Sequence, residues 1–237
     1  MASASQDAGK FVSIPALLDR NAEQFGDKAA YREKQYGIWQ TWTWSEARKE
    51  IRNLARGLIN MGVNKGDFIA IIGSNRPQLY WSMTAAQMVG AVPVPLYQDS
   101  AAEEMAYVLD HCGARFIIAE DQEQVDKVID CLTETPTLKH IIFVDGRGLW
   151  DYVEPRLIAH QALLEKAAAF NDHAGDRLIV PKRVFGLCSA NKANGAADDR
   201  RWARTVRVFE HIEQVKQGCR RVANRHDGAP QTVPPLF

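Results

Sequence analysis

Apolar residues follow two different spacings along roughly the first 175 positions of the chain. Short runs dominated by apolar residues are typical of buried strands, and they occur at Phe68–Ile72, Val92–Leu96, Phe116–Ala119 and His140–Val144. Between these runs, apolar residues recur every three or four positions, as they do on one face of a helix. Strands that alternate with helices predict an α/β fold with a largely parallel sheet flanked by helices.

Residues with capping chemistry mark the ends of the predicted helices. Thr43 with Glu46, and Ser100 with Glu103, each match the capping box in which two side chains satisfy backbone N–H groups at a helix start. Gly113 follows one predicted helix, at a position that favours a left-handed backbone conformation. Two further helices are expected at Val125–Leu132 and Ala159–Phe170.

A small β-hairpin is predicted near the N-terminus, from Ala29–Glu33 and Trp39–Trp44 with a turn at Tyr36-Gly37. Tryptophan occupies both faces of its second strand, since Trp39 and Trp42 have opposite parity. One interpretation is a stacking surface for the ring of a ligand. The other is a hairpin that packs on the main sheet through ordinary aromatic contacts.

The strand Val92–Leu96 begins the most informative stretch of the chain, Ala91–Asp130. Its apolar composition suits a buried parallel strand, whereas its two prolines suit an edge or a strand end. Ligands of open α/β sheets bind beyond the carboxyl ends of strands. Tyr97, Gln98 and Asp99, which follow this strand, are therefore predicted substrate-side residues, and a structural role for the loop is the alternative.

Two glycine-containing turns and one histidine are weaker candidates for a ligand site. Gly73-Ser74-Asn75-Arg76 follows a strand and either binds an anion or caps a helix through Asn75, with a solvated arginine. Gly146-Arg147-Gly148 lacks the third glycine of a dinucleotide-binding fingerprint, which favours a plain loop. His111 and Cys112 are adjacent but have no further metal-binding residues close in sequence, so no metal site is predicted.

Composition indicates an ordinary globular protein, with 46% hydrophobic and 24% charged residues. No apolar run approaches the ~20 residues of a membrane span, and Met1–Lys10 lacks the apolar core of a signal peptide. The cysteines show no short paired spacing, which fits a reducing cytoplasm; they are Cys112, Cys131, Cys188 and Cys219.

Charge divides the chain into two unlike parts. Residues 1–181 contain 18 basic and 24 acidic residues, whereas residues 182–237 contain 11 basic and 5 acidic ones. Aliphatic residues also become sparse in the second part, and this predicts an irregular tail. A basic tail is a candidate for binding nucleic acid or acidic lipid, but its charges are scattered among acids and give no clear nucleic-acid signal.

Several segments resemble the N-terminal portion of adenylate-forming acyl-CoA synthetases, and especially bacterial long-chain fatty acid–CoA ligases. The resemblance runs from about Ser13 to about Gly175 and rests on Gly37–Trp44, Lys65–Asp67 with Ile69–Ile72, Asn75–Pro77 with Tyr80-Trp81, and Ala91–Asp130. It implies a partial AMP-binding domain over residues 13–177, followed by a tail over 178–237. It also implies the family reaction, in which ATP, fatty acid and CoA give acyl-CoA, AMP and diphosphate with Mg²⁺.

The phosphate-binding loop of that family has no counterpart in this chain. The family's loop is rich in Thr, Ser and Gly and ends in Pro-Lys-Gly, so that backbone N–H groups surround the phosphates. At the corresponding place, Leu178–Ala197 contains Gly186 and Gly195 but no clustered glycines, and Pro181-Lys182-Arg183 lacks flanking glycines. The family's later motifs are not found either. No catalytic, cofactor-binding or metal-binding residue is therefore predicted, and ATP, CoA and Mg²⁺ are not expected to bind well.

Three functional hypotheses follow, and the third is the nucleic-acid binding by residues 182–237 described above. In the first, the chain is a truncated and inactive member of the fatty acid–CoA ligase lineage, whose tail arose from a shifted reading frame or a disrupted gene. In the second, it is a non-catalytic binding module whose exposed apolar surface favours partners or self-association.

Overall fold

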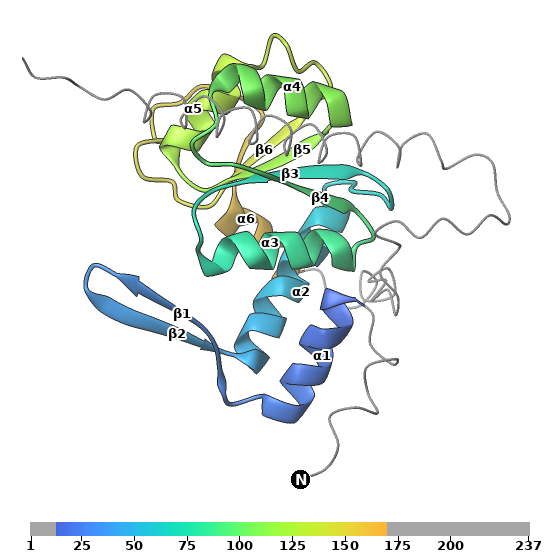
Figure 1. The fold of residues 1–237 in the computed structure, drawn as a ribbon, viewed down its shortest axis with the longest axis vertical. Coiled ribbons are helices and arrows are strands. Elements are labelled where there is room, and N and C mark those ends of the chain that lie inside the picture. Colours follow the sequence, from blue (N-terminus) through green and yellow to red (C-terminus); the bar gives the residue numbers. More distant parts are fainter. Residues whose placement is uncertain (1–12, 170–237) are drawn as a thin grey trace, which may run out of the picture. The chain divides into compact units, whose positions relative to one another are not determined.

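The computed structural model describes residues 13–169, where a parallel sheet has helices on both faces and a separate antiparallel hairpin lies beside it (Figure 1). The predicted fold class is confirmed. The predicted tail lies outside the described residues. The helices are α1 Ile14–Phe25, α2 Trp44–Asn60, α3 Pro77–Met88, α4 Ala102–Cys112, α5 Gln122–Asp130 and α6 His160–Ala169. The strands are β1 Ala29–Gln35, β2 Ile38–Thr43, β3 Phe68–Ile72, β4 Val92–Leu96, β5 Phe116–Ala119, β6 His140–Phe143 and β7 Leu157–Ala159.

The order of strands in the main sheet is β4-β3-β5-β6-β7, and all neighbouring pairs are parallel. The chain leaves β3 through α3 to reach β4, then returns past β3 through α4 to reach β5. Helices α2, α3 and α6 lie on one side of the sheet, and α4 and α5 on the other (Figure 1). The strand order therefore reverses between β3 and β5, and this is the switch point where α/β sheets bind ligands.

Strand β4 forms one edge of this sheet, as its prolines predicted. The Val92 N–H donates to the Asp67 carbonyl at 2.8 Å, so this residue and every second one after it direct their N–H groups toward β3. Pro93 and Pro95 occupy the alternate positions, whose N–H groups would otherwise face outward. At these two positions the edge offers no donor to a further strand, which protects it from pairing with another chain.

Only one of the two predicted capping boxes exists. Thr43 Oγ1 accepts from the Glu46 N–H at 3.2 Å, and the Glu46 carboxylate accepts from the Thr43 N–H at 2.8 Å. The Ser100 box is wrong, because Ala101 is the N-cap of α4 and no side chain caps this helix. The Ser100 N–H instead donates to the Tyr97 carbonyl in a turn, at 3.0 Å. A capping box needs its serine at the N-cap, and Ser100 lies one residue before that position.

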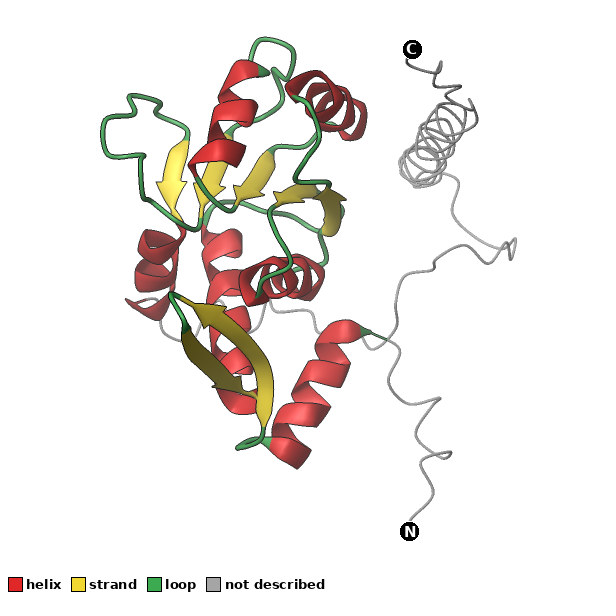
Figure 2. Cartoon of the chain, turned by 60° about the vertical axis from the view of Figure 1, so that its left-hand side comes forward, coloured by secondary structure: helices red, strands yellow, loops and turns green. Residues whose placement is uncertain are grey.

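The hairpin β1–β2 packs on helices rather than on the main sheet, which corrects one of the two interpretations. Trp81 of α3 meets Tyr31 and Trp42 edge to face, with ring centroids 5.8 and 5.4 Å apart. The predicted turn is confirmed, since Tyr36 and Gly37 both have positive φ angles, 49° and 81°. The hairpin thus extends from the helices on one side of the sheet, as Figure 2 shows from a second angle.

Helix α6 closes the described part of the chain by packing on α2. Gly57 makes this contact possible, because a Cβ there would lie 2.5 Å from Cγ of Leu163. Strand β7, which precedes α6, was not predicted, since a strand of three residues is too short for a periodic pattern. Among residues 13–169, no helix is both long enough and apolar enough to cross a membrane.

Candidate functional site

A cavity of about 410 Å³ lies at the carboxyl ends of β3, β5 and β6. It therefore sits at the switch point, where parallel strands leave backbone groups and loop side chains facing a common space. The hairpin contributes to its wall through Gln35 and Tyr36, and α3 contributes Gln78 and Ser82. The remaining lining residues come from the strand ends and the loops that follow them, including Ile72, Gly73, Ser74, Glu120, Asp145 and Arg147.

The turn between β3 and α3 binds a carboxylate that the protein itself supplies. Ser74 Oγ donates to the Glu120 carboxylate at 2.7 and 2.8 Å, and the Ser74 backbone N–H also donates to it. Arg76 Nη1 donates to the same carboxylate at 3.1 Å. Gly73 leaves space for this approach, because a Cβ there would lie 2.7 Å from Glu120 Oε2.

Arg76 also joins the hairpin to the sheet. Its Nε donates to Glu33 of β1, while its Nη1 contacts Glu120 just beyond β5. The two carboxylate side chains are only 12% and 15% exposed. One guanidinium thus bridges the hairpin, the start of α3 and the end of β5, and it fixes the hairpin beside the cavity.

Electrostatics keep this cluster charged. Burial by itself raises the pKa of Glu120, but the hydrogen bonds from Ser74 and Arg76 outweigh it and lower the pKa of the carboxyl overall. Burial likewise lowers the pKa of Arg76, while its bonds to Glu120 and Glu33 raise the pKa above the ordinary value. The Glu120 carboxylate and the Arg76 guanidinium are therefore both held in their charged forms.

Two further groups at the cavity are relevant to a ligand. Arg147 Nε contacts both oxygens of Asp145, at 2.8 and 2.9 Å, and its guanidinium lies 5.5 Å from the centre of the Tyr36 ring. Gln78 Oε1 is buried and accepts no hydrogen bond from the described residues. A molecule in this cavity would therefore meet carboxylates already in use and an exposed aromatic ring.

Comparison with known proteins adds the decisive observation. The model of the family described as AMP-binding enzyme matches residues 18–172, more than half of the chain. This chain belongs to the AMP-binding enzyme family.

The relatives of this AMP-binding chain include fatty acid ligases. The chain is 30% identical over 142 residues to long-chain-fatty-acid–CoA ligase FadD15 of Mycobacterium bovis, and the match covers 59% of this chain and 23% of the relative. The chain is 28% identical over 184 residues to long-chain-fatty-acid–CoA ligase ACSBG2 of Xenopus laevis, and this match covers 78% of this chain and 25% of the relative. The chain thus spans about a quarter of the length of these relatives.

A solved structure shows the same fold. Coronafacic acid ligase from Pectobacterium brasiliense superposes with a TM-score of 0.57 at 18% identity, covering 64% of this chain and 29% of that one. At this identity the likeness concerns the fold alone. The predicted resemblance to the AMP-binding acyl-CoA synthetases is therefore confirmed at the level of the family.

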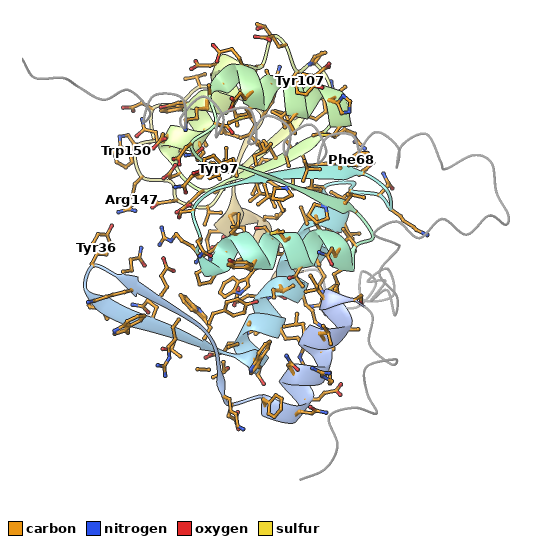
Figure 3. The ribbon with its side chains drawn as sticks, in the orientation of Figure 1. Tyr36, Phe68, Tyr97, Tyr107, Arg147 and Trp150 are labelled. Atoms are coloured by element: carbon orange, nitrogen blue, oxygen red, sulfur yellow. The ribbon has the colours of Figure 1, made fainter. Side chains whose placement is uncertain are left out.

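The predicted substrate-side loop of this AMP-binding chain does not line the cavity. Tyr97 is 66% exposed, and its pKa is raised by a hydrogen bond to Asp99 (Figure 3). The Gln98 carbonyl accepts from Lys127 Nζ of α5 at 2.8 Å. A role for Tyr97, Gln98 and Asp99 toward a substrate stays a prediction, since these contacts show only how the loop is held.

The turn Gly73–Arg76 holds a carboxylate of the protein itself. It was a candidate for anion binding, but Ser74 and Arg76 already donate hydrogen bonds to Glu120. A phosphate would have to displace a carboxylate held by several hydrogen bonds. The alternative prediction also fails in detail, because Arg76 is paired rather than solvated and Asn75 caps no helix. Within residues 13–169, no group of three or more His, Cys, Asp or Glu is arranged to hold a metal ion.

Sequence reasoning missed the cluster of Glu33, Arg76 and Glu120. These residues lie more than 40 positions apart, so no local pattern connects them. One signal was available, namely that Glu120 and Arg76 each follow closely after a predicted strand. Since the carboxyl ends of parallel strands meet at one edge of a sheet, the pair could have been inferred once β3 and β5 were taken as neighbours.

Proposed function

We propose that this chain is the opening α/β portion of a long-chain fatty acid–CoA ligase. The reaction of the complete enzyme joins a fatty acid to CoA and converts ATP to AMP and diphosphate, with Mg²⁺ as the metal. The family match over residues 18–172 carries this proposal, and the two fatty acid ligases among the relatives support the substrate class. Residues 13–177 correspond to the family domain, and residues 178–237 form a separate segment.

The chain alone does not catalyse this reaction. Adenylation needs donors aimed at the phosphates, because the reaction concentrates negative charge there. The turn most suited to that task is occupied by Glu120, and Leu178–Ala197 lacks clustered glycines. ATP, CoA and Mg²⁺ accordingly bind poorly to this chain.

Pyrophosphate exchange tests the absence of catalysis. The purified chain is incubated with ATP, Mg²⁺, labelled diphosphate and a long-chain fatty acid, and the label that enters ATP is measured. No exchange above the enzyme-free blank is expected. A complete fatty acid–CoA ligase serves as the positive control. Exchange that depends on both the chain and the fatty acid would show that the chain is catalytic.

The gene sequence tests the lineage separately. The DNA beyond the codon for Gly175 is resequenced and translated in all three frames. A Thr/Ser/Gly-rich loop ending in Pro-Lys-Gly is expected in a frame other than the one used. If no frame contains such a loop, the tail is the protein's own sequence, the shifted-frame account fails, and the binding module becomes the better candidate, while the family match over residues 18–172 stands.

A binding module is the second candidate, and exposed apolar side chains favour it. Trp39, Trp150 and Val153 are 64%, 76% and 99% exposed. Contiguous apolar surface of this kind would bind partners or a second copy of the chain. Light scattering of the purified chain distinguishes the cases, since a monomer at all concentrations counts against self-association. Binding of nucleic acid by residues 182–237 stays a separate prediction, and a salt-dependent gel shift tests it.

A further inference from the structure

The hairpin β1–β2 has two chemically different faces. Tyr31 and Glu33 of β1 point inward. Tyr31 packs on Trp81, and Glu33 pairs with Arg76. Side chains alternate along a strand, so the residues between them point outward. Together with their partners on β2, these residues make up the outer face of the hairpin, namely Arg32, Lys34, Trp39 and Thr41.

This outer face is exposed and carries only positive charge. Trp39 is 64% exposed, and it lies directly across from Lys34 in the register of the hairpin. None of the ion pairs within residues 13–169 involves Arg32 or Lys34, and the four residues of the face include no carboxylate. The hairpin's one acid on β1, Glu33, is held on the inner face.

An exposed tryptophan beside unpaired cations suits one particular environment, the surface of an anionic lipid bilayer. Trp and Tyr are enriched at the level of lipid headgroups because their rings are apolar and their edges are polar. Arg and Lys add attraction to anionic headgroups while their aliphatic stems contact the same boundary. The outer face combines both features within a few residues.

The hairpin is also accessible and held in place. It projects from the helices so that its tip, labelled by Tyr36, lies at the margin of the described part of the chain (Figure 3). Its inner face is anchored by the Trp42–Trp81 contact and the Glu33–Arg76 ion pair. An anchored hairpin loses little conformational freedom when it meets a flat surface, which favours binding. We propose that the outer face of the hairpin docks the protein on anionic membranes.

Vesicle co-sedimentation tests this proposal with the full chain. Vesicles contain phosphatidylcholine alone, or phosphatidylcholine and phosphatidylserine in equal parts. The chain is expected to sediment with the anionic vesicles, to bind the neutral ones weakly, and to dissociate as salt is added. Lys34→Glu should weaken partitioning by at least about fivefold, since one cation near such a surface contributes about that factor. Trp39→Ala should weaken it by roughly tenfold, through loss of apolar burial.

Lys139→Glu is the matched control. Lys139 is also an exposed lysine without a carboxylate partner among the described residues, and it directly precedes β6 in the main sheet, away from the hairpin. This variant makes the same charge change and should bind as the unaltered chain does. Equal losses for Lys34→Glu and Lys139→Glu would overturn the proposal, because net charge alone would explain them. Binding that neither hairpin variant weakens would assign attachment to another segment, such as the basic residues 182–237, and would also overturn it. The proposal would also be overturned if the chain formed a dimer that vesicles leave unchanged and that Trp39→Ala abolishes.

Discussion

Nη1 of Arg76 lies 3.1 Å from Oε1 of Glu120, and this ion pair closes the turn after β3 against the end of β5. The pair is partly buried, with 28% and 15% of the side chains exposed, and Glu33 shares the same guanidinium. It therefore holds together the hairpin, α3 and the sheet at the edge of the cavity. The stability of this region should depend on it more than on any exposed ion pair.

Glu120→Gln tests that dependence, because it keeps the shape of the side chain and removes its charge. We expect the free energy of unfolding to fall by about 1–3 kcal/mol, the usual cost of losing a charged partner for a partly buried group. Urea denaturation at neutral pH measures it. Glu123→Gln is the control, since its pair with Lys127 leaves the carboxylate side chain 69% exposed and should cost less than about 0.5 kcal/mol. Equal effects in both variants would contradict a structural role for the Arg76–Glu120 pair.

The buried imidazole of His160, the first residue of α6, should make the folded chain less stable in mild acid. Burial lowers the pKa of its imidazole from 6.5 to about 4, so the folded chain holds the ring neutral. Below pH 6.5 the unfolded chain binds a proton that the folded chain does not. Stability should therefore fall between pH 6.5 and pH 4, by about 3 kcal/mol.

The pH dependence of His160→Gln checks this assignment. Denaturation across that pH range should be flatter for the variant than for the unaltered chain. Some slope will remain, because burial and Arg115 also lower the pKa of His140. Glu120 has a pKa below its ordinary 4.5, so its contribution is lost only at lower pH. An unchanged profile in His160→Gln would show that this histidine is not the cause.

Truncation of the two tryptophans of β2 should change stability by very different amounts. Trp42 packs edge to face on buried Trp81, and Trp42→Ala should cost about 3 kcal/mol. Trp39 is 64% exposed, and Trp39→Ala should change stability by less than about 0.5 kcal/mol. Thermal unfolding of the two variants measures the difference. A large loss from Trp39→Ala would mean that its ring is buried in solution, against an assembly partner or elsewhere.

The two capping sequences give a second matched comparison. Thr43→Ala removes a side-chain acceptor at the start of α2 and should destabilise the chain by about 1 kcal/mol. Ser100→Ala should have little effect, because Ser100 precedes the N-cap of α4 and its side chain caps nothing there. Denaturant midpoints report both. Similar losses would indicate that α4 begins at Ser100 in solution.

Gly57 and Leu163 allow the docking of α6 to be measured. Gly57→Ala should raise helix propensity by about 1 kcal/mol but force its Cβ against Leu163, and overpacking of this kind costs about 1–3 kcal/mol. Leu163→Ala removes the obstacle at the cost of apolar burial. The double variant should therefore be more stable than the sum of the single effects predicts. Strict additivity would show that α6 does not pack on Gly57.

Local patterns along the chain were sufficient for most helices and strands. The runs at Phe68–Ile72 and Phe116–Ala119 match β3 and β5, and the Pro pattern of Val92–Leu96 correctly indicated an edge. Such features depend on neighbouring residues alone, through side-chain spacing, capping and the missing N–H of proline. The family resemblance also came from contiguous segments and was confirmed.

The tertiary structure decided what depends on residues distant in sequence. The order of strands places the switch point between β3 and β5, so the cavity forms there rather than beside Tyr97–Asp99. The same order brings Glu120 into the turn that sequence alone presented as open to an anion. The hairpin's separation into a packed inner face and a cationic outer face arises because only one face meets Trp81 and Arg76. Ion pairs and cavities are set by distances in space, and spacing along the chain does not specify those distances until the sheet is assembled.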